Sequence, residues 1–282
     1  MDVGLLIFAT DYSIGPAQLA RAAEDRGFSS LYFPEHTHIP TSRRDPWPGG
    51  AELPNEYRHT LDPFVGLAAA AAVTERLRIG TGICLVAQHD PIVLAKEIAT
   101  LDLVSNGRFM FGIGVGWNTD EMEQHGVDPK RRRAVVREKI LAMKALWEQE
   151  EASFEGEFVR FAPSWSWPKP VQRPHPPILM GGAGGPVTFR HVLEYCDGWM
   201  PIGGRSEITP RLHELRSAAE AAGRDPDSIR ILVFGGRGDP KSLQGYADLG
   251  VEEVILGLPP ADADKVLGVL DRHAAAVAEW RG

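Results

Sequence analysis

The 282-residue sequence has few cysteines, an excess of acidic over basic residues, and no apolar run long enough to cross a bilayer. Its two cysteines, Cys84 and Cys196, provide neither a disulfide framework nor metal-binding spacing, which indicates a reducing compartment. Thirty basic against 38 acidic residues give a net charge of −8. Nucleic acid and anionic membranes are therefore poor candidate partners. No signal peptide precedes the first strand pattern, so we expect a cytoplasmic protein.

Short β-rich runs alternate with amphipathic helical runs along the whole chain. The runs read as strands are 3–8, 29–34, 76–85, 108–115, 176–182, 197–202, 229–236 and 252–258. Eight such units predict an α/β fold, a (β/α)8 TIM barrel forming a single domain over residues 1–282. Insertions follow the second strand (about 36–60) and separate the fourth from the fifth (about 151–175). A doubly wound open sheet is the alternative, but the sequence shows no reversal of strand order.

The stretch GIGVGW, residues 112–117, resembles a dinucleotide-binding glycine turn. The Rossmann fingerprint needs a third glycine at its sixth position and an acidic residue about 20 positions later. Trp117 occupies that sixth position, and the following segment reads as a helix rather than a strand. We therefore interpret GIGVGW as the end of the fourth barrel strand, where glycines would let the backbone approach a ligand.

Active sites of TIM barrels lie at the carboxyl ends of the strands. Glu35 and His36 directly follow the second strand, so we expect both to be functional, whereas His38 is more simply read as structural. A metal site built on His36 and His38 is a competing hypothesis. The later strand ends supply glycine and proline instead of converging ligands, so we predict no metal.

Glycines mark two further strand ends. GGAGGP, residues 181–186, follows the fifth strand and opens a helix, and exposed backbone N–H groups in that setting bind phosphate. A plain tight turn would need fewer glycines. Gly82 lies inside the third strand, where it indicates either close approach of a ligand or room for a neighbouring side chain.

Several of these stretches occur together in one known family. SLYFPEH, DPIVLAKEIATLDLVSNGRF, GIGVGW, KPVQRPHPPILMGG and CDGWMP follow one another in family order and cover nearly the whole chain. On these segments the sequence resembles the luciferase-like monooxygenase superfamily, and within it the oxidoreductases that depend on the deazaflavin coenzyme F420. The resemblance implies a barrel that is usually dimeric, with the flat cofactor ring at its mouth.

The resemblance also implies roles for individual residues. Glu35 and His36 match an acid–histidine pair in which the acid contacts the cofactor and the histidine lies at the reactive face. Leu85 replaces a polar cofactor contact, and Trp117 replaces a catalytic glutamate of a sugar-phosphate dehydrogenase relative, which argues against that sugar oxidation here. The expected cofactor-binding residues are Glu35, Gly82, Ile83 (a position of a non-prolyl cis peptide), Val115, Gly116, Trp117, Asp120, Gly184, Gly185, Val187 and Thr188.

These matches predict hydride transfer between F420 and a small organic substrate, with His36 donating a proton or orienting the substrate. Two alternatives stay open: an FMN-dependent monooxygenase that uses oxygen, and a non-catalytic flavin-binding barrel. The 36–60 and 151–175 insertions are candidate lids that would select the substrate. We expect a homodimer whose ligands are small molecules.

Overall fold

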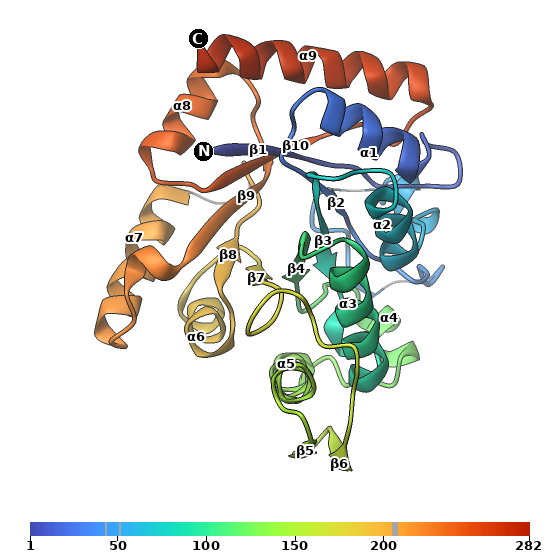
Figure 1. Cartoon of the computed structure of the whole chain (residues 1–282), viewed down its shortest axis with the longest axis vertical. Coiled ribbons are helices and arrows are strands. Elements are labelled where there is room, and N and C mark those ends of the chain that lie inside the picture. Colours follow the sequence, from blue (N-terminus) through green and yellow to red (C-terminus); the bar gives the residue numbers. More distant parts are fainter. Residues whose placement is uncertain (43, 51, 205–207) are drawn as a thin grey trace.

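A computed structural model describes residues 1–282 except 43, 51 and 205–207. Its centre is a closed barrel in which each strand pairs in parallel with the next and the last returns to the first (Figure 1). The barrel strands are β1 (Asp2–Leu6), β2 (Ser30–Phe33), β3 (Arg78–Cys84), β4 (Phe109–Ile113), β7 (Ile178–Gly181), β8 (Gly198–Met200), β9 (Arg230–Gly236) and β10 (Glu253–Gly257). This closure confirms the predicted (β/α)8 barrel and excludes the open sheet.

Helices surround the barrel and follow the strands in sequence. They are α1 (Pro16–Asp25), α2 (Pro63–Ala71), α3 (Pro91–Val104), α4 (Thr119–Gln124), α5 (Arg132–Glu148), α6 (Pro186–Tyr195), α7 (Ile208–Ala221), α8 (Pro240–Asp248) and α9 (Ala263–Arg281), with short 3-10 turns η1 (Asn55–Arg58), η2 (Val86–Gln88) and η3 (Pro226–Ser228). Helices α1, α2, α3, α6 and α8 begin at proline, whose fixed φ and missing N–H suit the first helical position. The proline-rich composition therefore supplies helix starts.

The apolar residues form two cores. The larger core fills the space between strands and helices, which explains why the strands read as near-continuous apolar runs. The smaller core fills the barrel interior with Tyr32, Met110, Leu179, Met200, Leu232 and Ile255, against which Leu6, Ile83 and Phe234 pack. The interior is thus a packed core, and space for a ligand has to lie at an end of the barrel.

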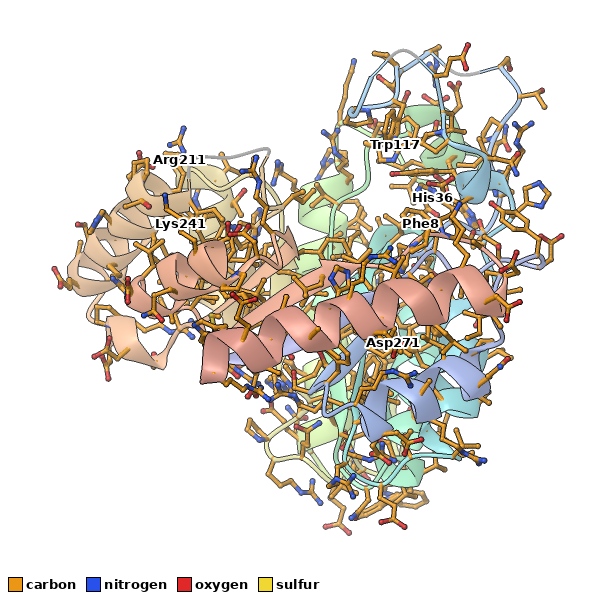
Figure 2. The ribbon with its side chains drawn as sticks, turned by 90° about the horizontal axis from the view of Figure 1, so that it is seen from above. Phe8, His36, Trp117, Arg211, Lys241 and Asp271 are labelled. Atoms are coloured by element: carbon orange, nitrogen blue, oxygen red, sulfur yellow. The ribbon has the colours of Figure 1, made fainter. Side chains whose placement is uncertain are left out.

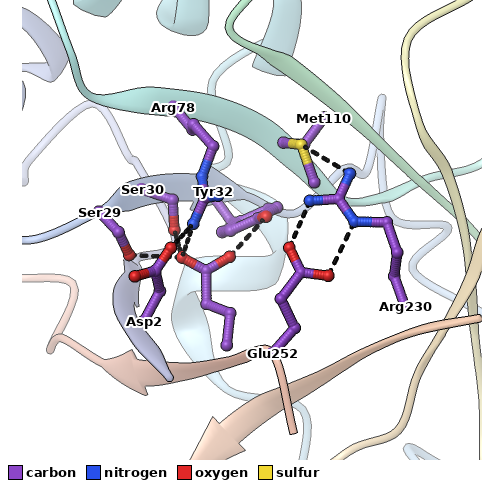
Figure 3. A network of polar contacts seen from close by, with 9 residues as sticks. Asp2, Ser29, Ser30, Tyr32, Arg78, Met110, Arg230 and Glu252 are labelled. Atoms are coloured by element: carbon purple, nitrogen blue, oxygen red, sulfur yellow. Dashed lines mark hydrogen bonds and ion pairs between the residues drawn. The ribbon is translucent and has the colours of Figure 1, made fainter. Parts of the chain in front are cut away.

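A polar network closes the end of the barrel where the strands begin (Figure 3). The buried carboxylate of Glu253 accepts hydrogen bonds from Ser30 Oγ at 2.7 Å and Tyr32 Oη at 3.2 Å. Arg78 Nη2 lies 3.0 Å from the same carboxylate and 2.7 Å from Asp2 Oδ2. Asp2, Ser30, Arg78 and Glu253 each open a strand, and Tyr32 reaches them from the barrel interior, so the network stabilises the face opposite the expected site.

The second insertion forms a small antiparallel hairpin, β5 (Ala152–Glu155) and β6 (Arg160–Ser164), beyond α5 in Figure 1. Glu138 of α5 accepts hydrogen bonds from three consecutive backbone N–H groups of the hairpin turn, Glu157 to Val159. Trp165 and Trp167 are exposed, and Lys96 of α3 donates to the carbonyl of Trp167. The structure places this insertion along the helical layer beside α5.

Both cysteines are free and buried, in agreement with the absence of a disulfide framework. Among the residues that the structure describes, no helix combines the length and apolar character needed to cross a membrane.

Candidate active site

The predicted functional residues lie at the end of the barrel where the strands finish. Figure 2 labels Phe8, His36 and Trp117, which follow β1, β2 and β4 and lie close together in that view. The ring centroids of His36 and Trp117 are 6.0 Å apart in an edge-to-face arrangement. Three strand ends therefore meet around the imidazole of His36.

The imidazole of His36 is held by a buried carboxylate that the sequence did not single out. Nδ1 of His36 lies 2.9 Å from Oε2 and 3.1 Å from Oε1 of Glu121. The side chains are 7% and 1% exposed, respectively, so the contact is shielded from water. Thr60 Oγ1 donates to the His36 carbonyl at 2.8 Å and fixes the backbone as well. His36 is thus fixed at both its ring and its backbone.

Aromatic rings line the same place. Tyr57 of η1 lies 5.2 Å from the His36 ring and 4.7 Å from Phe8, measured between centroids. Its ring also meets Trp117 at 6.5 Å and Trp47 at 5.8 Å, both edge to face. Edge-to-face packing at these separations is favourable for aromatic pairs. The 36–60 insertion therefore contributes an aromatic wall beside His36, as expected of a segment that covers the mouth.

The 36–60 loop is docked on α4 by polar contacts. Thr37 Oγ1 lies 2.7 Å from His125 Nε2, just beyond the end of α4, and His38 Nε2 lies 2.7 Å from Gln124 Oε1. Further along the loop, Arg44 pairs with Asp120 at 2.8 Å and also with Glu123, while Asp45 accepts from Thr119. These contacts are mostly exposed, so each one alone contributes little stability.

Glu35 points away from His36 and into the protein. It is 3% exposed, and its two oxygens accept from the Leu85 backbone N–H at 2.5 Å and from His89 Nε2 at 2.7 Å. Burial alone would raise the pKa of Glu35, but the hydrogen bond and charge of His89 and the Leu85 N–H outweigh it and lower that pKa. Glu35 thus ties the end of β2 to the segment after β3, with both oxygens engaged.

Glu35, Cys84 and His89 place three potential metal-ligand atoms within 4.8 Å of one another. A thiol binds metal as its thiolate. Burial, and then the charge of Glu35, raises the pKa of Cys84 well above its usual range. Because both Glu35 oxygens already accept hydrogen bonds, the arrangement is satisfied as a hydrogen-bonded cluster. The predicted absence of a metal stays a prediction.

The glycines of β3 and β4 make room for neighbouring groups. A Cβ on Gly82 would lie 2.4 Å from the Phe234 ring, and a Cβ on Gly114 would lie 2.3 Å from Cδ1 of Ile83. A Cβ on Gly112 would lie 2.1 Å from the carbonyl oxygen of Thr81. The peptide between Gly82 and Ile83 is cis, at the position that the resemblance indicates. Close packing within the barrel thus accounts for three of the glycines in the motifs.

The glycine turn before α6 has an unusual backbone. Gly182, Gly184 and Gly185 all have positive φ, at 140°, 86° and 111°. Gly185 is the residue preceding the helix, no side chain caps the helix start, and a Cβ there would meet nothing within 4 Å. The first N–H groups of a helix attract anions when space is open in front of them. This turn suits the phosphate role expected of Gly184, Gly185, Val187 and Thr188.

A cavity of about 630 Å³ opens at the same end of the barrel, between the loops after β8 and β9 and helix α8. Its volume is within the range of about 300–1,000 Å³ usual for small-molecule sites. Its lining includes Gly203, Gly204, Thr209, Gly235, Arg237 and Tyr246. The cavity thus lies between α7 and α8, and none of its lining residues is a predicted site residue.

The structure brings together only part of the predicted set. Trp117 meets His36, and Val115 and Gly116 lie in the same partly buried segment after β4. Asp120 is engaged by the backbone N–H and guanidinium of Arg44. Each carboxylate oxygen can accept a second hydrogen bond, so these existing contacts do not exclude the cofactor roles expected of Glu35 and Asp120. The cofactor-binding assignments themselves stay predictions.

Glu121, Tyr57 and Thr60 are site residues that sequence reasoning missed. Asn118 and Glu121 have the spacing of a helix capping box, and Asn118 does accept from the Glu121 N–H at 3.3 Å. In a capping box the glutamate would turn back to the backbone of Asn118. Its side chain binds His36 instead. The capping motif in the sequence therefore explains where the helix starts, but it does not indicate the contact with His36.

The fold and the site define a (β/α)8 barrel with an imidazole held at its mouth by a buried carboxylate. The chain belongs to the luciferase-like monooxygenase family, whose model matches residues 16–236. The chain is an oxidoreductase, which confirms the class of activity that the resemblance in sequence implied.

The relatives differ in the cofactor that is printed in their names. An uncharacterized protein of Mycobacterium tuberculosis is 48% identical over 281 residues, 99% of each chain. The F420-dependent hydroxymycolic acid dehydrogenase of the same organism is 29% identical over 248 residues, 86% of this chain and 63% of that one. The FMNH(2)-dependent dimethylsulfone monooxygenase of Pseudomonas putida is 33% identical over 201 residues, 63% of this chain and 54% of that one.

Two solved structures share the whole fold. The monooxygenase RslO1 of Streptomyces bottropensis superimposes with a TM-score of 0.79 at 24% identity, with 100% of both chains covered. An F420-dependent secondary alcohol dehydrogenase superimposes with a TM-score of 0.78 at 19% identity, also over 100% of both chains. At these identities the likeness shows the fold alone.

Proposed function

We propose that this protein is an F420-dependent oxidoreductase that moves a hydride between the coenzyme and a small organic substrate. The observation that carries the proposal is His36, an imidazole fixed at the barrel mouth by Glu121 and flanked by Tyr57 and Trp117. The F420-dependent hydroxymycolic acid dehydrogenase, a relative over 86% of this chain, supports the choice of coenzyme.

The residues at the mouth fit the coenzyme at its phosphate end. The turn at Gly184 and Gly185, where space is open beside Gly185, would hold phosphate, and the backbone of Val115 and Gly116 would contact the ring region. When bound, the deazaflavin supplies two-electron hydride chemistry. The expected contact between Glu35 and the coenzyme fits less well, because the Glu35 side chain is only 1% exposed. In this proposal Glu35 supports the mouth from below and does not contact the coenzyme.

His36 would handle the proton that accompanies the hydride. Reduction of a carbonyl adds hydride to carbon and a proton to oxygen, and oxidation of an alcohol removes both. Imidazole donates or accepts protons near neutral pH, which suits either direction. The aromatic wall of Tyr57 and Trp117 limits access of water to this place.

An FMN-dependent monooxygenase is the second candidate. The Pseudomonas putida relative, whose name carries FMNH(2), favours it. The fold does not distinguish the two cofactors, since the solved structures that share it include an F420-dependent enzyme and a Baeyer-Villiger monooxygenase in complex with FMN.

Fluorescence titration of the purified protein with F420 and with FMN tests the proposal. We expect saturable binding of F420 and weaker binding of FMN. Turnover is then followed as oxidation of reduced F420 with 2-cyclohexenone as a probe, and His36→Ala should lower kcat by about 10²- to 10⁴-fold. Preference for FMN, or full turnover by His36→Ala, would overturn the respective assignment.

We also propose a homodimer formed through α2 and α3. These helices pack against each other at the right of Figure 1. They leave Val65, Ile92, Val93, Leu103 and Val104 between 46% and 72% exposed, an unusual concentration of apolar side chains for a free surface. Light scattering coupled to gel filtration should give the dimer mass for the wild type and the monomer mass for Val65→Glu combined with Val93→Glu. A monomeric wild type would contradict the proposal.

A further inference from the structure

Glu121 is a buried carboxylate that needs a partner. It is 1% exposed, and within the described part of the chain the only hydrogen bonds to its carboxylate oxygens come from Nδ1 of His36. An ionised carboxylate without a hydrogen-bond donor is costly to bury. Nδ1 of His36, at 2.9 and 3.1 Å from the two Glu121 oxygens, therefore supplies the donor that this buried carboxylate needs.

A carboxylate at Nδ1 decides where the imidazole carries its proton. A carboxylate oxygen only accepts, so Nδ1 has to be the donating nitrogen. In the neutral ring the other nitrogen, Nε2, is then an acceptor, and in the charged ring it is a donor. The same Nε2 atom can therefore take a proton from a hydroxyl or return one to a carbonyl oxygen.

We propose that Glu121 is a positioning residue, which holds His36 with its proton on Nδ1 and keeps Nε2 as the proton-exchanging atom. This inference rests on the proposed function of His36. The surroundings of His36 and Glu121 support this proposal. The rings of Tyr57 and Trp117 lie beside His36, and a hydrogen bond to a charged group is stronger where water is excluded. Glu121 acts through His36 and does not itself touch the substrate.

The contact could instead serve only to dock the 36–60 loop on α4. The neighbouring bond between Thr37 and His125, at 2.7 Å, docks the same loop and leaves the His36 ring alone. Thr37→Val is therefore a matched control for Glu121→Gln. A docking role makes the two variants alike, and a positioning role makes them differ at His36.

The decisive measurement is the tautomer of His36, read from ¹⁵N–¹H correlation spectra of the labelled, full-length protein without cofactor. The His36 signals are identified by their loss in His36→Ala. We expect protonated Nδ1 in the wild type and in Thr37→Val, and loss of that preference in Glu121→Leu, which has no acceptor, whereas the carbonyl oxygen of Glu121→Gln can still accept from Nδ1. A wild-type His36 protonated on Nε2 alone, or an unchanged tautomer in Glu121→Leu, would overturn the proposal. The result does not depend on which cofactor binds.

Kinetics separate positioning from mere stability. With reduced F420 and 2-cyclohexenone, Glu121→Gln should lower kcat by roughly 10- to 100-fold, as loss of a histidine's carboxylate partner does elsewhere, with little change in KM. Thr37→Val should keep kcat within about threefold. In the His36→Ala background, Glu121→Gln should have no further effect, because residues that act as a unit are not additive. A further loss in that background would show that Glu121 acts independently of His36.

Discussion

Nε2 of His89 lies 2.7 Å from Oε1 of Glu35, and this ion pair joins the end of β2 to the segment that leads into α3. Burial alone would lower the pKa of His89, but the hydrogen bond and charge of Glu35 raise it. The contribution of His89 to stability is thus complete below its unfolded pKa of 6.5 and is lost as pH rises through the raised folded pKa. For Glu35, whose pKa is lowered, the contribution is complete above 4.5 and is lost as pH falls through the folded pKa.

We therefore expect His89→Gln to be most harmful between these two values. Breaking a buried pair costs roughly 3 kcal/mol. Urea unfolding of wild type and variant at several pH values should show a difference in unfolding free energy of that size near pH 5.5, which narrows as the pH rises above 6.5. A gap that stays constant over this range would show that the lost side-chain packing, and not the charge, is responsible.

The glycines of β4 provide a second prediction. At Gly112 a Cβ would meet the Thr81 carbonyl oxygen, and backbone in a closed barrel cannot move aside. Gly112→Ala should therefore lower the free energy of unfolding by about 3 kcal/mol, the upper range for overpacking. Gly114→Ala should cost less, because the obstructing atom is the far end of the Ile83 side chain. Gly245→Ala, in a helix with open space, should stabilise by about 0.5–1 kcal/mol and controls for the mutation type. Equal effects at all three positions would refute the packing argument.

Removal of Arg44 should loosen the 36–60 loop without unfolding the protein. Its guanidinium pairs with Asp120 and Glu123 at the surface, so Arg44→Ala should leave the free energy of unfolding nearly unchanged. Hydrogen exchange followed by mass spectrometry should nevertheless show faster exchange in peptides from this loop. Arg131→Ala, which removes the exposed pair with Glu157 elsewhere, serves as the control. Unchanged exchange in the loop would mean that the other contacts to α4 suffice.

The polar network opposite the site should affect stability and leave ligand binding alone. Glu253→Ala leaves the buried side of Arg78 without its carboxylate and should destabilise by roughly 3–5 kcal/mol. Asp2→Ala removes the exposed partner of the same arginine and should cost less than about 1 kcal/mol. Affinity for F420 should stay at the wild-type level in any variant that remains folded, since the two faces of the barrel are separate. A large loss of affinity in folded Glu253→Ala would show coupling through the barrel.

The fold could be predicted because the same sequence pattern, a short apolar strand followed by a helix, repeats along the chain. Both faces of each barrel strand are covered, so every strand produces a short apolar run, and each run was placed within two residues of the observed strand. The boundaries differ by up to two residues at either end of a strand. The run at 197–202, for example, contracts to Gly198–Met200 before Pro201. The hairpin in the second insertion was not predicted, because its strands are largely exposed and lack an apolar run.

The site was predictable only in part because its contacts join distant segments. Position after a buried strand identified Glu35 and His36, but successive side chains of an extended chain point to opposite sides. One of the two therefore enters the protein while the other faces the mouth. Glu121 lies 85 positions from His36. Its place in a helix-capping motif already accounted for it, so nothing in the sequence indicated that it pairs with His36. Glycine positions showed that something approaches closely, without showing whether it is a ligand or a neighbouring side chain.

Ile83 fills space where several strands of the barrel end. Its branches reach toward Gly114 on one side and Gly181 on the other, while Phe234 presses on the adjacent Gly82. Ile83 of β3 thus packs against the ends of β4 and β7, and its neighbour Gly82 packs against β9. Shortening Ile83 to valine or alanine would open space between these strand ends without touching His36, and replacing a facing glycine by alanine would fill it. Evolution or an engineer could in this way alter the size of molecule admitted while leaving the proton-handling machinery in place.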